Sequence, residues 1–135
     1  MLIILIWLGS VLPSKYIDVI KTCEAHGPNH CLVLQEAHWN IMFEKYKDML
    51  ALSSERVQQL TLSERTDILR LLYLYDIGGI YSDLHTKVDF PCLYDLVNSN
   101  KDELFFGQDE SNSALPSSHI VYAPTPKHPE LKRII

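Results

Sequence analysis

The sequence predicts an α/β domain in which helices flank a mostly parallel sheet. Two short segments, Leu2–Leu8 and Cys31–Gln35, are almost entirely apolar, which is typical of strands buried on both faces. Segments with apolar residues at helical spacing follow each of them, and this alternation of strand and helix is typical of parallel sheets. The chain has 135 residues, which suffices for one domain with a core of its own.

The first predicted strand, Leu2–Leu8, ends where Gly9 and Ser10 interrupt the apolar run. An alternative is that this run is the core of a signal peptide. It lacks a basic flank and a small-x-small cleavage site, and it is shorter than the roughly 20 apolar residues that span a bilayer. We therefore favour the strand and expect no transmembrane segment.

The next elements alternate in the same way. A helix opens at Pro13 and ends near Ala25, because proline is favoured in the first helical turn and the apolar residues that follow have helical spacing. The segment His26–His30 has the composition of a turn. The second strand, Cys31–Gln35, follows it, and a second helix covers about Trp39–Leu50.

The clearest helix signal begins at Thr61, which forms the S/T-x-x-E pattern of a capping box with Glu64. This helix runs to about Asp76, where Gly78 and Gly79 end it, since glycine accepts the left-handed conformation at a helix end. The remaining predicted elements are a strand at Ile80–His85, a loop and short helix at Asp89–Val97, strands at Glu103–Gln108 and His119–Ala123, and a last helix from about Lys127.

Charge and cysteine content narrow the function classes. The net charge is −5 and no cluster of lysine and arginine appears, so we expect no nucleic-acid partner. An acidic protein that binds phosphates usually does so through a metal ion or a few local arginines. Cys23, Cys31 and Cys92 are too few and too scattered for a disulfide framework, which predicts free thiols in a reducing compartment. The cytoplasm is favoured, with a Golgi lumen or a secreted effector left open.

Candidate ligands for a metal ion lie at the end of the strand Ile80–His85. Side chains alternate along a strand, so Tyr81, Asp83 and His85 are expected on one face. A carboxylate and an imidazole at i and i+2 can hold one divalent ion, and this pair of ligands suits manganese or zinc better than calcium. The alternative is a structural one, with Asp83 accepting hydrogen bonds from a turn beside an exposed His85.

Asp67 and Arg70 are three residues apart and therefore neighbours on one helix face. They could form a surface ion pair. The segment Ile68–Ile77 is otherwise very apolar, however, so an acid and a guanidinium within it are expected to face a polar cleft and bind sugar hydroxyls or phosphate. Trp7, at the end of the first strand, could stack on a nucleobase or could belong to the core.

Together these segments resemble a known family. "DILRLLYLYDIGGIYSDLH", residues 67–85, resembles the signature of D-x-D sugar transferases such as glycosyltransferase family 32 and the large clostridial glucosylating toxins. "LIILIWLGSVLP" resembles the opening strand of that family, and "YAPTPKHPEL" resembles its later A-x-P-x-H-P-x-L segment. The matching residues are Trp7, Gly9, Leu12, Pro13, Asp67, Arg70, Leu74, Gly78, Gly79, Tyr81, Asp83, Ala123, Pro126, His128, Pro129 and Leu131.

The resemblance implies a GT-A type nucleotide-diphosphosugar transferase fold. It also implies retaining transfer of a sugar from a UDP- or GDP-sugar to a hydroxyl of a glycan, lipid or protein. Trp7 and Tyr81 would belong to the donor-binding set with Asp67 and Arg70, which would hold the sugar and ribose. Asp83 and position 85 would bind Mn²⁺ or Mg²⁺ bridging the two phosphates, so that Asp67, Arg70 and Asp83 form the catalytic set.

Three features depart from the family pattern. His85 replaces the second aspartate of D-x-D, and Ile4 and His119 replace a usual histidine and asparagine. The family's catalytic domains are longer than this chain, so residues 1–135 are expected to form a single, partial domain that corresponds to the donor-binding half. A second hypothesis is therefore a non-catalytic relative that binds nucleotide sugar or only keeps the fold. A third, an unrelated interaction domain, requires the three motif segments to be coincidental.

Overall fold

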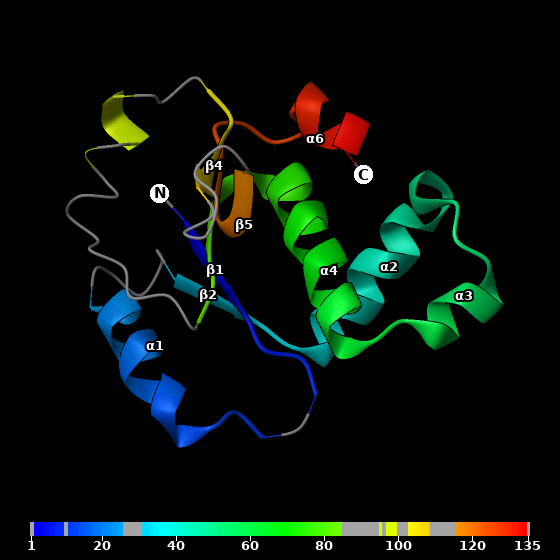
Figure 1. Cartoon of the computed structure of the whole chain (residues 1–135), viewed down its shortest axis with the longest axis horizontal. Coiled ribbons are helices and arrows are strands. Elements are labelled where there is room, and N and C mark those ends of the chain that lie inside the picture. The colour runs from blue at the N-terminus through cyan, green and yellow to red at the C-terminus, as the bar shows by residue number, and fades with distance from the viewer. Residues whose placement is uncertain are drawn as a thin grey trace.

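The predicted α/β class is confirmed. The computed structural model describes residues 2–9, 11–25, 31–84, 95, 97–99, 103–108 and 116–134, and within them a single sheet lies between helices (Figure 1). The described strands are β1 (Ile3–Ile6), β2 (Cys31–Leu34), β3 (Gly79–Ser82), β4 (Phe105–Gln108) and β5 (Pro116–Ala123), arranged in the order β2-β1-β3-β5-β4.

The sheet is mostly parallel, as expected. β1 pairs in parallel with β2 and with β3, whereas β5 pairs antiparallel with both β3 and β4. Among the described strands, β5 therefore runs against the common direction of the other four. Because β1 and β3 are neighbours and parallel, their carboxyl ends lie at the same edge of the sheet.

Helices cover both faces of this sheet. They are the 3-10 helix η1 (Ser14–Tyr16), α1 (Ile17–Glu24), α2 (Glu36–Leu50), α3 (Ser54–Gln59), α4 (Leu62–Ile77) and α6 (Pro129–Ile134). In Figure 1, α1 lies on one side of the sheet and α2 and α4 lie together on the other.

Buried side chains of the described residues form a cluster on each face. Ile4 and Ile6 of β1 point toward α2 and α4, where they pack with residues such as Leu69 and Leu72. Their neighbours on the strand, Ile3 and Leu5, join the cluster on the α1 side. This alternation of fully apolar contacts explains why the strand sequence is apolar at every position.

In the first part of the chain, two predicted boundaries were wrong and one helix was not predicted. The helix expected from Trp39 begins at Glu36, because Gln35 and His38 cap its first turn reciprocally. The short α3 was not predicted at all, and the Ser53 side chain caps it by accepting a hydrogen bond from the Arg56 N–H at 3.1 Å. The strand expected to reach His85 ends at Ser82.

In the later part of the chain, some predicted boundaries are shifted and some predicted elements lie outside the described residues. β5 starts at Pro116 and not at His119, and α6 starts at Pro129. Most of the loop and helix expected at residues 89–97 lies outside the described residues, as does Cys92. Cys23 and Cys31 are free thiols, as expected.

α4 has the boundaries that its capping signals predict. The Thr61 hydroxyl accepts a hydrogen bond from the Glu64 N–H at 3.1 Å, and the Glu64 carboxylate accepts one from the Thr61 N–H at 3.2 Å. At the other end Gly78 has a φ of +73°, and its N–H donates to the Leu74 carbonyl at 2.9 Å. The helix is therefore fixed at both ends.

Gly79 allows α4 to turn directly into β3. Its φ is +113°, and a Cβ at this position would lie 2.7 Å from the Leu2 carbonyl oxygen. The close approach lets the Ile80 N–H donate to the same carbonyl at 2.8 Å, which starts the pairing of β3 with β1. Glycine is needed here because a side chain would be strained in φ and would collide with the backbone.

Candidate functional site

A pocket of about 350 Å³ lies at the carboxyl ends of β1 and β3, beside the first half of α4. Its lining residues are Ile6, Trp7, Leu8, Leu62, Ser63, Thr66, Asp67, Arg70, Tyr81, Asp83 and Leu84. Five of the six predicted site residues are in this set. The sixth, His85, lies outside the described residues.

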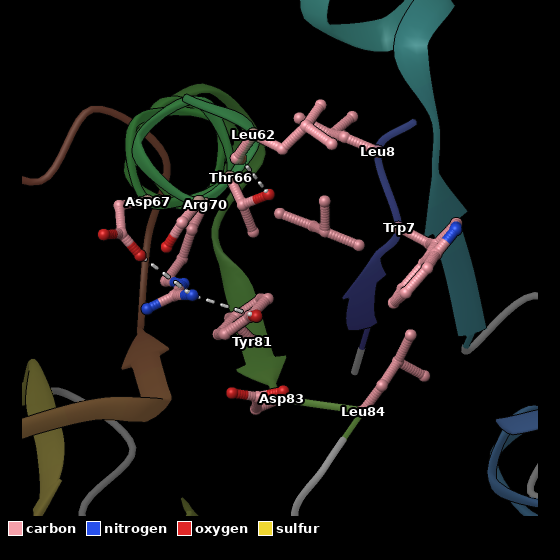
Figure 2. Close-up of a pocket in the computed structure, with 11 residues that line it drawn as sticks. Trp7, Leu8, Leu62, Thr66, Asp67, Arg70, Tyr81, Asp83 and Leu84 are labelled. Atoms are coloured by element: carbon pink, nitrogen blue, oxygen red, sulfur yellow. Dashed lines mark hydrogen bonds and ion pairs between the residues drawn. The ribbon is translucent and has the colours of Figure 1, made fainter. Parts of the chain in front are cut away.

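The pocket has a polar side and an apolar side. Figure 2 shows Asp67, Arg70, Tyr81 and Asp83 on one side, and Trp7, Leu8 and Leu84 on the other. The polar groups come from α4, from β3 and from the residue just after β3. A ligand with a charged or hydroxyl-rich part and a flat apolar part therefore matches the lining.

Trp7 lies one residue after β1, and its backbone N–H donates to the Leu34 carbonyl of β2 at 3.0 Å. The indole is half-buried and packs beside the Tyr16 ring, with 5.5 Å between the ring centroids and 46° between the planes. Tyr16 itself is buried. The indole thus has a packed neighbour that supports its position while part of its surface lines the pocket.

Asp67 and Arg70 are in contact, as neighbours on one helix face should be. The distance from Arg70 Nη2 to Asp67 Oδ1 is 3.2 Å. The Arg70 side chain is only 7% exposed, whereas that of Asp67 is 61% exposed. The pair therefore extends from the interior of the pocket to its rim, which differs from the surface ion pair that was the alternative.

Tyr81 lies under the guanidinium of Arg70. The Arg70 Cζ atom is 4.1 Å from the centre of the Tyr81 ring, and Arg70 Nη2 donates a hydrogen bond to the Tyr81 hydroxyl at 3.1 Å (Figure 2). Burial raises the pKa of Tyr81 to about 12; Arg70 opposes this shift, and the nearby charges of Asp83 and Asp67 add to it. The phenol therefore stays protonated at neutral pH.

Asp83 follows β3 directly and is half-buried at the pocket edge. Its carboxylate is near enough to Tyr81 to raise the pKa of that phenol. No group of three or more potential metal ligands occurs among the described residues. Asp83 by itself has the chemistry of a single ligand for a divalent cation, since carboxylate oxygen is a ligand that Mn²⁺ and Mg²⁺ accept.

The sequence analysis missed two hydroxyl side chains, Ser63 and Thr66, which line the pocket. The Thr66 hydroxyl donates to the Leu62 carbonyl at 2.9 Å. A signal for both was present, because Ser63, Thr66 and Arg70 follow one another at intervals of three and four on the helix. If Arg70 faces a cleft, this spacing predicts that the side chains of Ser63 and Thr66 face the same cleft.

Comparison with known proteins gives one family match. Residues 13–106 match the family model of a glycosyltransferase sugar-binding region containing a DXD motif. The match covers more than half of the chain, including α4 and β3, while Trp7 precedes it. No curated protein and no solved structure matches the chain significantly.

The mostly parallel sheet flanked by helices is consistent with the GT-A type fold. Across the described residues no helix is long and apolar enough to cross a membrane.

Proposed function

Because the chain belongs to the family of glycosyltransferases whose sugar-binding region contains a DXD motif, we propose that its pocket binds a UDP- or GDP-sugar and that the sugar is transferred, with retention, to a hydroxyl acceptor. The observation that supports this most is the convergence of Trp7, Asp67, Arg70, Tyr81 and Asp83 on one pocket. These residues come from three separate parts of the sequence: the end of β1, the first half of α4 and the end of β3.

In this proposal the base of the nucleotide stacks on Trp7. Stacking requires only a flat ring with an accessible face, and it is worth about 1–3 kcal/mol per base. The indole is half-buried and packs beside the Tyr16 ring, so stacking of the base would cost little side-chain conformational entropy. Within the family, the three motif segments in order favour kinship with the family 32 type and with the glucosylating toxins.

Asp67 and Arg70 would hold the sugar and the ribose. The carboxylate of Asp67 accepts hydrogen bonds from hydroxyls, and its exposed position places it where a sugar could enter. Arg70 is almost fully buried and its charge is held in place by Asp67 and Tyr81. A fixed positive charge aimed into a pocket stabilises negative charge that develops on a leaving diphosphate.

Asp83, with His85 at the second position of the motif, would hold Mn²⁺ or Mg²⁺. When bound, such an ion neutralises the charge of the departing diphosphate, so no protein group has to protonate it. Water and phosphate oxygens would complete the ligand shell. The acceptor would be a hydroxyl of a glycan, a lipid or a protein.

The test is a thermal-shift panel of UDP- and GDP-sugars with and without Mn²⁺. We expect at least one nucleotide sugar with Mn²⁺ to raise the melting temperature, since a ligand that binds the folded state stabilises it. Asp83→Ala should abolish the part of the shift that depends on metal. The matched control is Asp18→Ala, which removes an exposed carboxylate on α1, away from the pocket. A wild-type protein that responds to none of the nucleotide sugars would contradict the proposal.

One observation favours a second candidate, a domain that binds nucleotide sugar without transferring it. Position 85 is histidine where the motif has aspartate, which changes one metal ligand. An assay that detects UDP or GDP released from the nucleotide sugar, run at high protein concentration, separates the two candidates. Detectable turnover eliminates the non-catalytic one, and binding without turnover supports it.

A further inference from the structure

Two cysteines meet on the face of the sheet that α1 covers (Figure 1). Cys23 is in the last turn of α1, and Cys31 is the first residue of β2. Both are free thiols in this structure. The chemistry proposed for the pocket uses neither of them, so their proximity points to a separate role.

The register of the sheet directs the Cys31 side chain toward α1. Paired residues of neighbouring strands point to the same face of a sheet. Cys31 is paired with Ile3, whose side chain belongs to the apolar cluster on the α1 side. Cys23 is buried in that cluster, and Cys31 packs against it. The two side chains therefore converge from a helix and a strand that are in contact.

The two thiols form a hydrogen bond with each other. This hydrogen bond lowers the pKa of Cys31, although burial and the nearby Glu24 carboxylate oppose the shift. The same hydrogen bond raises the pKa of Cys23, and burial raises it further. Cys31 therefore loses its proton before Cys23 does.

The two thiols also differ in their access to solvent. Cys31 is half-buried, so a small molecule in solution can reach its sulfur. Cys23 is 0% exposed, so such a molecule does not reach it directly. An accessible thiol of lowered pKa beside a shielded second thiol is the arrangement of a nucleophilic and a resolving cysteine.

We propose that Cys23 and Cys31 form a reversible disulfide between α1 and β2, with a low-molecular-weight disulfide as the oxidant. The Cys31 thiolate attacks one sulfur of the small disulfide, which releases one small thiolate and leaves a mixed disulfide on Cys31. Cys23 then attacks the Cys31 sulfur, and the second small thiolate leaves and takes up the Cys23 proton. Two protein thiols are oxidised, and one small disulfide is reduced to two thiols.

The disulfide fastens α1 to the sheet. It closes the short segment 23–31 into a ring, which restricts the unfolded chain and thereby stabilises the folded one. α1 continues directly from η1, whose Tyr16 packs beside Trp7 at the pocket. Oxidation therefore strengthens the attachment of the element that supports the indole.

The first test locates the bond in the folded wild-type chain, incubated with oxidised and reduced glutathione in graded ratios and with a metal chelator. Peptide mapping by mass spectrometry should find Cys23 linked to Cys31, and excess reduced glutathione should release the bond. Cys92→Ser is the matched control, because it removes the third cysteine and should leave the reaction unchanged. A bond that involves Cys92, or thiols that stay unlinked at every ratio, would overturn the inference.

Single variants in the Cys92→Ser background test the order of the two steps. In Cys23→Ala the reaction should stop with one glutathione on Cys31, because no second thiol is present to displace it. In Cys31→Ala the buried Cys23 should react at least about 10-fold more slowly, since access limits its reaction. Equal rates in the two variants would show that Cys31 is not the nucleophile.

Thermal unfolding of the wild type in its two redox states measures the consequence. The oxidised form should melt about 5–10 °C higher, as closure of a ring of this size predicts, and Cys23→Ala should melt at the same temperature under both conditions. Equal melting temperatures of the two wild-type forms would overturn the stabilising role. None of these measurements uses a nucleotide, so their failure and the failure of the proposed function are distinguishable.

Discussion

Some side chains of the pocket are both polar and buried, and Arg70 is the clearest example. Its side chain is 7% exposed, its charge is paired with that of Asp67, and it donates a hydrogen bond to the Tyr81 hydroxyl. Removal of one partner from a buried charge is strongly destabilising, because the charge left behind is not compensated. Asp67 therefore contributes to the stability of the pocket as well as to its proposed chemistry.

Trp7 gives a sharp prediction at this scale. Trp7→Leu should weaken nucleotide binding by about 5- to 150-fold, the range that corresponds to 1–3 kcal/mol of stacking, because leucine has no flat face. Trp7→Phe should retain most of the affinity. Calorimetric titration with the nucleotide measures the affinity of each variant, and quenching of tryptophan fluorescence in the wild type tests whether the indole is involved.

Trp39 is the matched control, since the chain contains two tryptophans. Trp39 is 4% exposed and stacks on Phe43 in the core, with 5.6 Å between the ring centroids. Trp39→Phe should lower the melting temperature and leave the nucleotide affinity unchanged. The opposite pattern, with Trp7→Leu binding normally, would remove Trp7 from the site.

Much of the candidate site was predictable residue by residue. The sequence predicts Trp7, Asp67 and Asp83 because each is a polar or aromatic residue at the end of a strand or within an apolar helix, and all three line the pocket. The contact between Arg70 and the Tyr81 ring was not predictable. It depends on how α4 packs over β3, and no spacing within the sequence encodes that distance.

At the level of elements, α4 is tied to α2 and to the segment before α6 through Asp76. Its carboxylate accepts hydrogen bonds from Lys45 at 2.8 Å, from Lys127 at 3.2 Å and from the Tyr46 hydroxyl. The Lys127 N–H also donates to the Tyr75 carbonyl in the last turn of α4 at 2.5 Å. This cluster fixes the carboxyl end of the helix whose other half lines the pocket.

The Asp76 cluster predicts how stability depends on pH. Burial opposes ionisation of Asp76, but hydrogen bonds from Lys45, Tyr46 and Lys127 outweigh it and lower its pKa from 3.8 to about 2. Because the folded-state pKa is the lower one, the stabilisation is fully present above about pH 4 and is lost as the pH falls through 2. The difference corresponds to about 2 kcal/mol.

Urea unfolding of Asp76→Asn measures this contribution. We expect the variant to be less stable than the wild type by about 2 kcal/mol at pH 7. The difference should be much smaller near pH 2, where the carboxyl is partly protonated in the folded wild type and almost fully protonated in the unfolded chain. Asp48→Asn, an exposed residue of α2, serves as the control and should change little. A loss that is equal at both pH values would show that the carboxylate charge does not stabilise the cluster.

Helices were predicted correctly where the sequence marks their ends clearly. α4 was predicted correctly because Thr61, Glu64 and Gly78 mark both of its ends with specific hydrogen bonds. α3 was missed because it has six residues, none of them buried, so it has no apolar stripe to detect. The early start of α2 was missed because His38 takes the place that glutamate or glutamine usually has in a capping box.

At the level of the whole molecule, the pairing of β1 with β3 creates the site. The register places Ile3 opposite Ile80 and Ile4 opposite Tyr81, although these pairs are far apart in the sequence. Trp7 and Asp83 therefore leave the sheet at the same edge, where open α/β sheets bind ligands. A parallel sheet was predictable from the alternation of elements. The antiparallel direction of β5 was not, because it depends on contacts of β5 with β3 and β4.

The most direct test of the account is a crystal structure of the protein with Mn²⁺ and the nucleotide sugar that it binds most tightly. The account predicts that the base lies against Trp7 and the diphosphate beside Asp83, with the sugar between Asp67 and Arg70. A nucleotide bound elsewhere on the molecule, or in this pocket with its base turned away from Trp7, would contradict it.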